Sequence, residues 1–352
     1  MVRIGIVGIG FMGYTHFEGA RTLHGGQVTA ISTRSEKKLA GDWTGIQGNF
    51  GPPGGHVDVS QLKCYSDYRQ LLNDPEIDLV DVCLPTDQHF QVVMESLAAG
   101  KPTLVEKPIS VDVREAVQMV DAAERAGVPL LVAHVLPFFP EFRFAAEAIQ
   151  DGRFGALKAA HFRRVISPPD WSRDMSDFRK LGGWGIDLHI HDNHFIAHAC
   201  GQPESVFSRG LLHDGLVNHV HTSYVFGSDG PAVSSVSGGI AAKGLAFGHG
   251  FELYFDDATL MFDAGTFGGE WVVSRPLTLI KNDGTVEPVV LAGSDSWCGA
   301  FTDELQVAVN HLAQGTPPGP LCSRTALNAL QICCAEAASI ASGKVTKIGT
   351  SC

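Results

Sequence analysis

Short apolar runs alternate with helix-like segments up to about residue 135 of the chain. Five runs have the length and composition of buried strands, and they lie at residues 2–7, 28–32, 79–84, 103–106 and 130–134. The segments between them carry helical periodicity, which is clearest at 86–99 and 112–126. Strands that alternate with helices build a parallel sheet with helices on both faces. The pattern therefore predicts an α/β domain with a doubly wound parallel sheet.

Residues typical of turns and helix caps indicate where the expected helices begin and end. Thr86 is expected to cap the first of the two helices, and Asp112 and Glu115 have capping-box spacing at the start of the second. Gly127 is expected to end that second helix. The Gly/Pro-rich segment 41–58 is expected to be a surface insertion rather than a site.

The pattern changes after about residue 155. Alternating, β-rich segments follow to about residue 281, and turns such as those at 227–230 and 282–284 separate them. This predicts a mostly antiparallel sheet, with one face on helices and the other available to a second subunit. Helical periodicity returns over 301–342. We expect two domains, 1–135 and 136–352, with the last helices packing back on the first domain.

The amino-acid composition limits the classes of molecule that the protein is expected to bind. The net charge of -12 argues against nucleic acid and anionic membranes, because both require basic patches. The chain has no apolar run long enough to cross a membrane and no signal-peptide pattern at its start. The eight cysteines are scattered without a Cys-x-x-Cys pair and are expected to be reduced thiols. These features together predict a cytoplasmic protein.

The first apolar run ends in glycines at positions 8, 10 and 13, before a helical period. In this context Gly8 permits a tight turn, Gly10 lets a pyrophosphate approach the backbone, and Gly13 lets helix and strand pack closely. The helix N-terminus then offers free N–H groups to phosphate. The motif predicts a Rossmann domain that binds a dinucleotide.

The residues that follow the second strand help to distinguish NAD from NADP as the expected cofactor. A carboxylate there would bind the ribose hydroxyls of NAD. The strand instead runs into Thr33 and Arg34, which suit a 2′-phosphate, although Glu36 lies close enough to serve NAD. NADP is therefore the favoured cofactor and NAD the alternative.

Two further motifs, Leu84-Pro85-Thr86-Asp-Gln-His89 and Glu106-Lys107-Pro108, follow strands of the same sheet. Ligands of such sheets bind outside the carboxyl ends of the strands. A lysine held there can hydrogen-bond a reacting hydroxyl, whereas a plain Glu–Lys ion pair is the structural alternative. The expected cofactor-binding residues are Gly8, Gly10, Phe11, Met12, Gly13, Thr33, Arg34, Leu84, Pro85, Thr86, His89, Glu106 and Lys107.

Together with the segment GGWGIDLHIHD at 182–192 and the closing helix FTDELQVAVNHL at 301–312, these motifs lie in one order along nearly the whole chain. The sequence resembles the Gfo/Idh/MocA family of glucose–fructose oxidoreductases, inositol dehydrogenases and related sugar dehydrogenases. The resemblance implies a second domain with an open, mostly antiparallel sheet through which subunits often pair. It also implies NAD(P)-dependent oxidation or reduction of a sugar, polyol or related carbonyl.

The resemblance assigns the catalytic roles to Lys107, Asp187 and His191. His191 would exchange a proton with the substrate oxygen, Lys107 would hydrogen-bond the same oxygen, and Asp187 would orient these groups. A helix from Asp187 to about Cys200 would align Asp187 and His191 with His194 and His198 on one face, with His189 and Asp192 elsewhere. The residues expected to bind substrate are Lys107, Trp171, Asp187, His191 and His194.

The sequence departs from the family pattern at two positions. His194 stands where an aspartate is usual, and Pro137 stands where relatives commonly carry an arginine. Both changes bear on the identity of the substrate, and Pro137 bears on turnover itself. Trp184 is either a wall of the sugar site or a core residue, and of Arg163 and Arg164 only one can face the site.

Three other functions compete with the dehydrogenase. A metal site built on Asp187, His191 and His194, with a further ligand from His219, His221 or His249, is less favoured, and no metal is expected. A glycosidase that oxidises and re-reduces its substrate on a retained NAD would use the same chemistry. A non-catalytic regulator that binds a nicotinamide cofactor is the third. The favoured assembly is a homodimer or homotetramer that binds a carbohydrate-like substrate.

Overall fold

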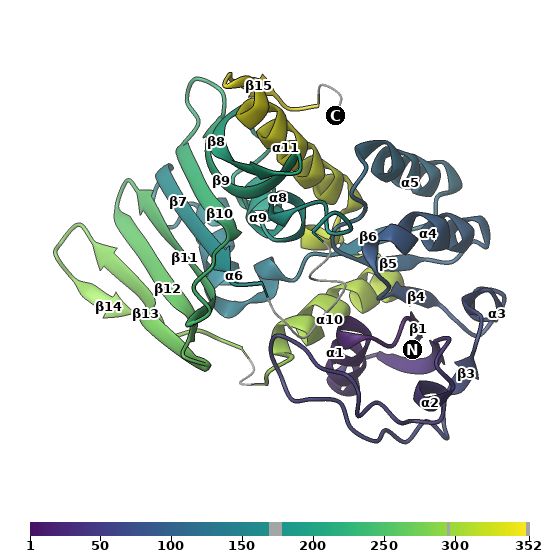
Figure 1. Ribbon diagram of the computed structural model, residues 1–352. Helices are drawn as coiled ribbons and strands as arrows, with labels where there is room; N and C mark the ends of the chain where they lie inside the picture. The colour runs from purple at the N-terminus through teal and green to yellow at the C-terminus, as the bar shows by residue number, and fades with distance from the viewer. Residues whose placement is uncertain (169–177, 294–295, 350–352) are drawn as a thin grey trace. The chain divides into compact units, whose positions relative to one another are not determined.

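The computed structural model describes residues 1–168, 178–293 and 296–349 (Figure 1). The chain forms two compact units. The first contains Met1–Phe138 and Gly293–Leu327, and the second contains Phe139–Ala292 and the chain from Asn328 onward. The sequence-based division had its single boundary at residues 135/136. In the described part of the chain, no helix is long and apolar enough to cross a membrane.

The first unit is built on a six-stranded sheet in which every pair of neighbours is parallel. Its strands, in spatial order, are β3 (Lys63–Tyr65), β2 (Gly26–Ser32), β1 (Val2–Val7), β4 (Leu79–Val82), β5 (Thr103–Glu106) and β6 (Leu130–Ala133). The predicted doubly wound α/β fold is confirmed. β3 was missed because it is an edge strand of three residues without an apolar run.

The helices of the first unit follow the strands along the chain. They are α1 (Phe11–Gly19), α2 (Glu36–Leu39), α3 (Tyr68–Leu72), α4 (His89–Ala98), α5 (Val113–Ala126) and α10 (Gly299–Gln314), with the beginning of α11 (Ser323–Ser342). α10 packs against α1 in this unit. It comes from the tail of the chain, where the sequence predicted helix.

The predicted helix ends are partly right. Asp112 caps α5 by accepting a hydrogen bond from the backbone N–H of Arg114 at 2.8 Å, and Gly127 ends the helix in the left-handed conformation at φ 63°. Glu115 does not complete a capping box; it accepts a hydrogen bond from the Ser110 hydroxyl at 2.7 Å. Thr86 starts a short 3₁₀ turn, Thr86–Gln88, and α4 begins only at His89.

The segment 41–58 is more than a surface insertion. Trp43 within it is fully buried, and its indole ring lies 4.9 Å from the ring of Phe17 and 6.1 Å from that of Tyr14, both on α1. Phe50 of the same segment stacks 5.4 Å from the ring of Phe301 on α10. The Gly/Pro content made the segment look external, whereas Trp43 anchors it in the core and the partly exposed Phe50 adds a contact with α10.

The second unit is built on a nine-stranded sheet. Its strands, in spatial order, are β14 (Val286–Pro288), β13 (Glu270–Lys281), β12 (Ala258–Phe267), β11 (Leu245–Phe255), β7 (Leu157–Ile166), β10 (Ala232–Gly239), β9 (Leu216–Val225), β8 (Ser205–His213) and β15 (Thr346–Lys347). All neighbouring pairs are antiparallel except β7 and β10, so the predicted mostly antiparallel sheet is confirmed.

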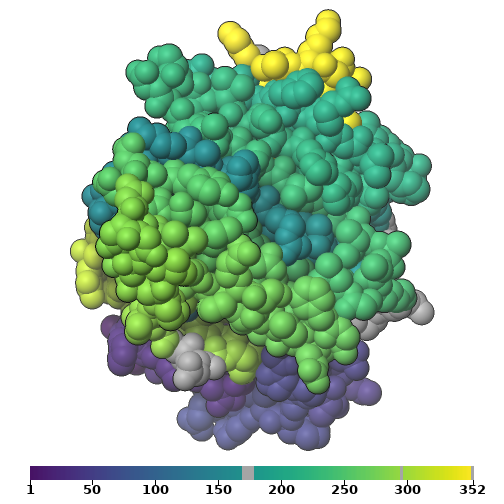
Figure 2. Space-filling model, turned by 90° about the vertical axis from the view of Figure 1, so that its left-hand side faces the viewer, coloured from purple at the N-terminus to yellow at the C-terminus, as the bar shows by residue number. Residues whose placement is uncertain are grey.

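Helices of the second unit lie on one face of this sheet (Figure 1). They are α6 (Pro140–Asp151), α8 (Trp184–Asp187), α9 (Ile190–Ala199) and the later part of α11. The other face, seen in Figure 2, carries exposed side chains that include Phe207, Arg209 and Val272. Large apolar side chains on an uncovered sheet face are typical of a surface that pairs.

The Gly-Gly-Trp-Gly segment positions α8 against β9. A Cβ on Gly183, whose φ is +79°, would lie 2.7 Å from the carbonyl oxygen of Val217, and a Cβ on Gly185 would lie 2.7 Å from the Cβ of Val217. Trp184 between them is only 3% exposed and packs with Ile166 and Leu188. The glycines are therefore required by close packing, and Trp184 is a core residue rather than a wall of an open site.

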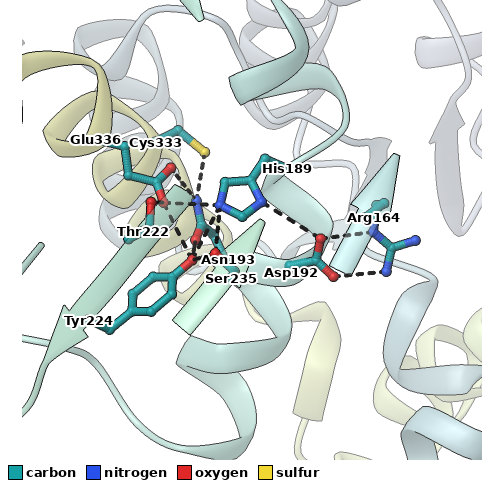
Figure 3. Close-up of polar contacts among 9 residues, drawn as sticks. All are labelled: Arg164, His189, Asp192, Asn193, Thr222, Tyr224, Ser235, Cys333 and Glu336. Atoms are coloured by element: carbon teal, nitrogen blue, oxygen red, sulfur yellow. Dashed lines mark hydrogen bonds and ion pairs between the residues drawn. The ribbon is translucent and has the colours of Figure 1, made fainter. Parts of the chain in front are cut away.

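A buried polar network joins α9 to α11 and to the sheet (Figure 3). The side chain of Glu336 on α11 is contacted by His189 Nε2 at 3.0 Å, the amide of Asn193 at 2.9 Å and the hydroxyls of Thr222 at 2.8 Å and Tyr224 at 3.4 Å. Tyr224 adds hydrogen bonds through its hydroxyl to Asn193 and Ser235. His189, Asn193 and Glu336 have 1% exposure or less, so the network acts inside the core.

The network continues to β7 through Asp192 and Arg164. The Arg164 guanidinium donates two hydrogen bonds, each of 3.0 Å, to the two oxygens of Asp192. Arg163, the preceding residue, points to the other face and pairs with Asp263 at 2.5 Å. The strand alternation predicted from the sequence thus separates the two arginines, and the inner one positions α9.

The charges of this network shift the pKa of His189. Burial by itself lowers the pKa of the imidazole, but the charge of Glu336 and hydrogen bonds with Asp192 and Glu336 outweigh burial and raise it to about 9. Burial likewise opposes the charge of Asp192, and Arg164 nevertheless keeps the pKa of that carboxyl below its usual range. His189 is therefore a cation in the folded protein at neutral pH.

The thiols were all expected to be reduced. Among the described residues the free cysteines are Cys64, Cys83, Cys200, Cys298, Cys322 and Cys333. Cys334 is disulfide-bonded, which corrects the expectation at that position.

Because the folded-state pKa of His189 is raised, its stabilising effect is complete below the unfolded-state pKa near 6.5 and disappears as the pH rises through about 9. We predict that His189→Gln destabilises the protein at pH 6 and has a much smaller effect above pH 9. The change in the free energy of unfolding between the two conditions should be on the order of 3 kcal/mol. Urea unfolding of both proteins across this range measures it.

His161→Gln is the matched control for that experiment, because His161 is an exposed histidine on the same sheet. It should leave the pH dependence of unfolding as in the wild type. An equal loss of stability at both pH values in His189→Gln would contradict a charged His189.

Candidate functional site

The glycine-rich turn between β1 and α1 has no room for side chains at two of its three glycines. Gly8 has φ +100°, and a Cβ on it would lie 2.7 Å from the carbonyl oxygen of Cys83. A Cβ on Gly13 would lie 2.0 Å from the carbonyl oxygen of Gly8. These contacts give Gly8 and Gly13 the roles expected from the motif, a tight turn and close packing of helix on strand.

Gly10 is different, because a Cβ there would meet nothing within 4 Å. Gly10 is also the N-cap of α1, and no side chain makes a capping hydrogen bond to this helix end. A bare backbone with open space in front of a helix N-terminus is a cradle that a phosphate group fits. The turn therefore fits the diphosphate of a dinucleotide, with Phe11, Met12 and Gly13 in the first turn of the helix.

Thr33 and Arg34 follow β2 at the same edge of the sheet. The backbone N–H of Thr33 donates to the carbonyl oxygen of Tyr65 at 3.1 Å, and its hydroxyl accepts from the N–H of Ser35 at 3.3 Å. Arg34 is exposed. Both positions are where the sequence analysis expected them, directly after the second strand.

Sequence reasoning missed Lys38. Its ammonium donates to the carbonyl oxygen of Ile9 in the glycine-rich turn at 2.5 Å, and burial lowers its pKa. Lys38 lies in α2, which Ser35 caps. The sequence shows a lysine after a capping serine at this point, but the short helix that returns it to the turn is not visible in the apolar pattern.

His89 links the two loops that follow β4 and β5. One ring nitrogen lies 2.8 Å from the carbonyl oxygen of Leu84, and the other lies 3.0 Å from that of Pro108. The side chain is fully buried, and this burial lowers its pKa. His89 thus holds the Leu84-Pro85-Thr86 loop beside the Glu106-Lys107-Pro108 loop, which favours a positioning role over direct contact with a cofactor.

Glu106 and Lys107 differ sharply in exposure. Glu106 is 5% exposed, and one carboxylate oxygen accepts from the backbone N–H of Lys107 at 3.0 Å. Its other oxygen lies 3.1 Å from Nε2 of His16 in the interior. Lys107 is half-buried at the end of β5. The glutamate therefore supports the loop from within, and the lysine is the member of the pair with access to a ligand.

The segment around Asp187 and His191 differs from the single helix that was expected. Asp187 is the last residue of α8, and α9 begins only at Ile190. The proposed stripe from Asp187 to His198 is therefore wrong as a continuous helix face, because the chain breaks from helix at Leu188 and His189. Within α9, His191 is half-buried, and the ring of His194 stacks on that of His198 with centroids 6.3 Å apart.

Other candidate residues lie as follows. Trp171 falls outside the described residues. Pro137 is buried in a 3₁₀ turn of the first unit. His249 is buried against the ring of Phe142 at 5.5 Å, so it is a core residue rather than a fourth metal ligand.

Lys107 belongs to the first unit, and Asp187, His191 and His194 belong to the second. Among the described residues, the group whose donor atoms lie close enough to hold a metal ion is elsewhere, at His16, Asp81 and Cys83.

The proteins to which this chain is similar include a dehydrogenase and a glycosyl hydrolase. Myo-inositol 2-dehydrogenase from Thermotoga maritima is 27% identical over 60% of this chain and 59% of its own length. Glycosyl hydrolase family 109 protein 1 from a Shewanella species is 26% identical over 55% of this chain and 41% of its own length. The matches thus span about half the length of these curated relatives.

Aldose-aldose oxidoreductase from Caulobacter crescentus shares the fold over 99% of both chains, with a TM-score of 0.79 and 17% identity. Residues 2–134 match the model of the oxidoreductase family with an NAD-binding Rossmann fold, GFO_IDH_MocA. Residues 2–134 therefore form an NAD-binding domain of this oxidoreductase family.

Proposed function

We propose that the protein is an NAD(P)-dependent dehydrogenase or reductase that acts on a CH–OH group of a sugar, polyol or sugar-derived substrate. The observation that carries this proposal is the bare phosphate cradle at Gly8, Gly10 and Gly13, with Lys107 at the end of β5 in the same sheet. The likeness to myo-inositol 2-dehydrogenase over part of the chain supports the substrate class.

The chemistry proposed for the chain's own side chains is proton transfer and charge stabilisation. When bound, a nicotinamide supplies the hydride acceptor or donor. His191 takes the proton from the substrate hydroxyl during oxidation and returns it during reduction. The Lys107 ammonium hydrogen-bonds the same oxygen and stabilises the negative charge that develops on it.

The remaining groups position the reactants in this proposal. Asp187 orients the reacting groups and favours the protonated form of the histidine or lysine. Trp171 and His194 are the proposed contacts with the substrate. His194 replaces an acidic group of the family pattern, so the hydrogen-bonding partner offered to the sugar differs in kind.

NADP is the proposed preference over NAD. Arg34 at the end of β2 is exposed and can pair with a 2′-phosphate, and no carboxylate directly follows the strand. Lys38, whose ammonium contacts the glycine-rich turn, adds a second positive group on the same side.

A closed-cycle glycosidase is the second candidate function. The likeness to glycosyl hydrolase family 109 protein 1 favours it, over a similar share of this chain. Such an enzyme would use the same nicotinamide chemistry with no net reduction of cofactor. Release of the leaving group from an aryl glycoside therefore distinguishes the two candidates.

The uncovered face of the second sheet is the proposed subunit interface. Its exposed apolar residues, which include Phe207 and Val272, share this face with charged groups such as Arg163 and Asp263. A self-complementary patch of this kind suits a homodimer, or a homotetramer made of two such pairs.

Replacing Lys107 by Ala should lower kcat by about 10²–10⁴-fold, because general acid–base and charge-stabilising groups contribute on that scale. His191→Asn should have an effect of similar size. Cofactor binding, followed by protein fluorescence, should remain in both variants. Lys158→Ala, which removes an exposed lysine of the second unit, is the control. Turnover near the wild-type rate in Lys107→Ala would refute the assigned role.

Arg34→Ala should weaken NADP binding about tenfold, the loss expected for one charge-assisted hydrogen bond, and should leave NAD binding nearly unchanged. Titration of both cofactors against wild type and variant measures this. Lys37→Ala is the matched control, because Lys37 is an exposed cation three residues away. Equal losses for NAD and NADP would argue against recognition of the 2′-phosphate.

Phe207→Asp on the uncovered face should convert the assembly to smaller species in sedimentation velocity, because it places a charge in an apolar interface. Val290→Asp, at a residue that is 95% exposed, should have no effect. A wild-type protein that sediments as a monomer would contradict the proposed interface.

A further inference from the structure

A cluster of titratable side chains lies inside the first unit, directly beneath the glycine-rich turn. His16 comes from α1, and Asp81 and Cys83 come from β4 and the residue that follows it. His16 and Asp81 have no exposed surface, and Cys83 is 7% exposed. The proposed hydride transfer uses none of the three.

The donor atoms of the cluster are spaced as the ligands of a tetrahedral metal would be. Zinc bonds of about 2.3 Å to sulfur and about 2.0 Å to nitrogen or oxygen separate sulfur from either by about 3.5 Å, and nitrogen from oxygen by about 3.3 Å. In the structure, Sγ of Cys83 lies 3.5 Å from Nδ1 of His16 and 3.5 Å from one carboxylate oxygen of Asp81. Nδ1 of His16 lies 2.9 Å from the other oxygen of Asp81.

The second ring nitrogen of His16, Nε2, faces carboxylates, as it commonly does in a histidine that binds a metal. Nε2 of His16 lies 3.1 Å from Glu106 and 3.8 Å from Glu304 of α10. A histidine that ligates a metal commonly offers its other ring nitrogen to a carboxylate, which fixes the ring orientation. Nε2 makes no hydrogen bond with the described residues in this arrangement, and the two carboxylates lie near enough to become its outer-shell partners when a metal is bound.

The cluster is short of positive charge. Three buried carboxylates, those of Asp81, Glu106 and Glu304, surround one histidine. Neither oxygen of Glu304 has a hydrogen-bond partner among the described residues, although the side chain is fully buried. Buried carboxylates in this number require protons or a cation.

We propose that His16 Nδ1, the Asp81 carboxylate and the Cys83 thiolate bind one divalent transition-metal ion, with zinc as the best match. A thiolate with an imidazole and a carboxylate is a donor set that zinc accepts. Binding replaces the proton of the Cys83 thiol and any proton on Nδ1 of His16, and these protons leave to solvent. The charges of Asp81 and Cys83 then balance the ion.

The role that follows is structural. The ion would tie α1 to β4 one turn beyond Gly13, whose close contact with Gly8 forms the phosphate cradle. Because the site has no exposed surface at two of its three ligands, it would fill as the chain folds. Loss of the metal should then lower thermal stability and weaken cofactor binding together.

The test is to unfold the full-length protein with a chelator present and to refold it with Co²⁺, which absorbs visible light in tetrahedral sites. We expect one Co²⁺ per chain and an absorption band from the thiolate–cobalt bond. Cys83→Ser should remove the sulfur band. Glu304→Gln, which changes an outer-shell partner, should weaken Co²⁺ binding about 10–100-fold and keep the band.

Cys298→Ser is the matched control, because Cys298 is the other buried free cysteine of the first unit. It should leave the spectrum and the affinity unchanged. Wild-type protein that refolds in Co²⁺ or Zn²⁺ without retaining metal would overturn the proposal and leave the cluster as a network held by protons. A sulfur band that persists in Cys83→Ser would also overturn it. If Cys83→Ser does not fold, the wild-type spectrum decides alone.

Discussion

The contact between the backbones of Gly8 and Gly13 is the constraint on which the first unit depends. A Cβ on Gly13 would lie 2.0 Å from the Gly8 carbonyl oxygen, so only glycine lets α1 approach β1 this closely. The approach leaves the N-terminus of α1 facing open space at Gly10, which makes a phosphate cradle. It also carries His16 down to Asp81 and Cys83 on the neighbouring strand. One steric requirement thus sets both the proposed cofactor site and the proposed metal site.

Each unit contains a buried histidine surrounded by carboxylates, and the two clusters are balanced differently. In the second unit, His189 faces Glu336 and Asp192, and Arg164 brings a second positive charge. In the first unit, the carboxylates of Asp81, Glu106 and Glu304 all lie within 4 Å of the His16 ring nitrogens, and neither oxygen of Glu304 has a hydrogen-bond partner among the described residues. Removing one member of a buried ion pair typically costs about 3–5 kcal/mol, so both clusters are sensitive points of the fold. The imbalance is why a metal ion is proposed in one cluster and not in the other.

The apolar pattern predicted much of this architecture because strands buried on both faces read as short continuous apolar runs. The runs at 2–7 and 103–106 coincide with β1 and β5, and Asp112 caps α5 as its spacing predicted. β3 was not predicted because it is a short strand at the edge of the sheet. The burial of Trp43 was not predicted because the glycines and prolines around it suggested a surface loop.

The histidine-rich segment shows what local periodicity cannot determine. Its spacing suggested a helix from Asp187 onward, but the close packing of Gly183 and Gly185 on β9 creates a separate short helix first. His189 looked unimportant on that helix, and its partner Glu336 lies 147 residues away in sequence. Pairing at such a distance leaves no local signal. The assignment of Lys107 and His191 came instead from motifs and a family resemblance, and it stays a prediction.

The central claim is that the chain carries out net hydride transfer with a carbohydrate-like alcohol. The most direct measurement is the appearance of reduced cofactor when the purified protein is mixed with NADP⁺ or NAD⁺ and a panel of sugars, inositols and sugar acids. The account predicts reduction that depends on one class of substrate and is faster with NADP⁺. Binding of both cofactors without reduction by any substrate, together with cleavage of an aryl glycoside, would contradict it in favour of a closed-cycle glycosidase.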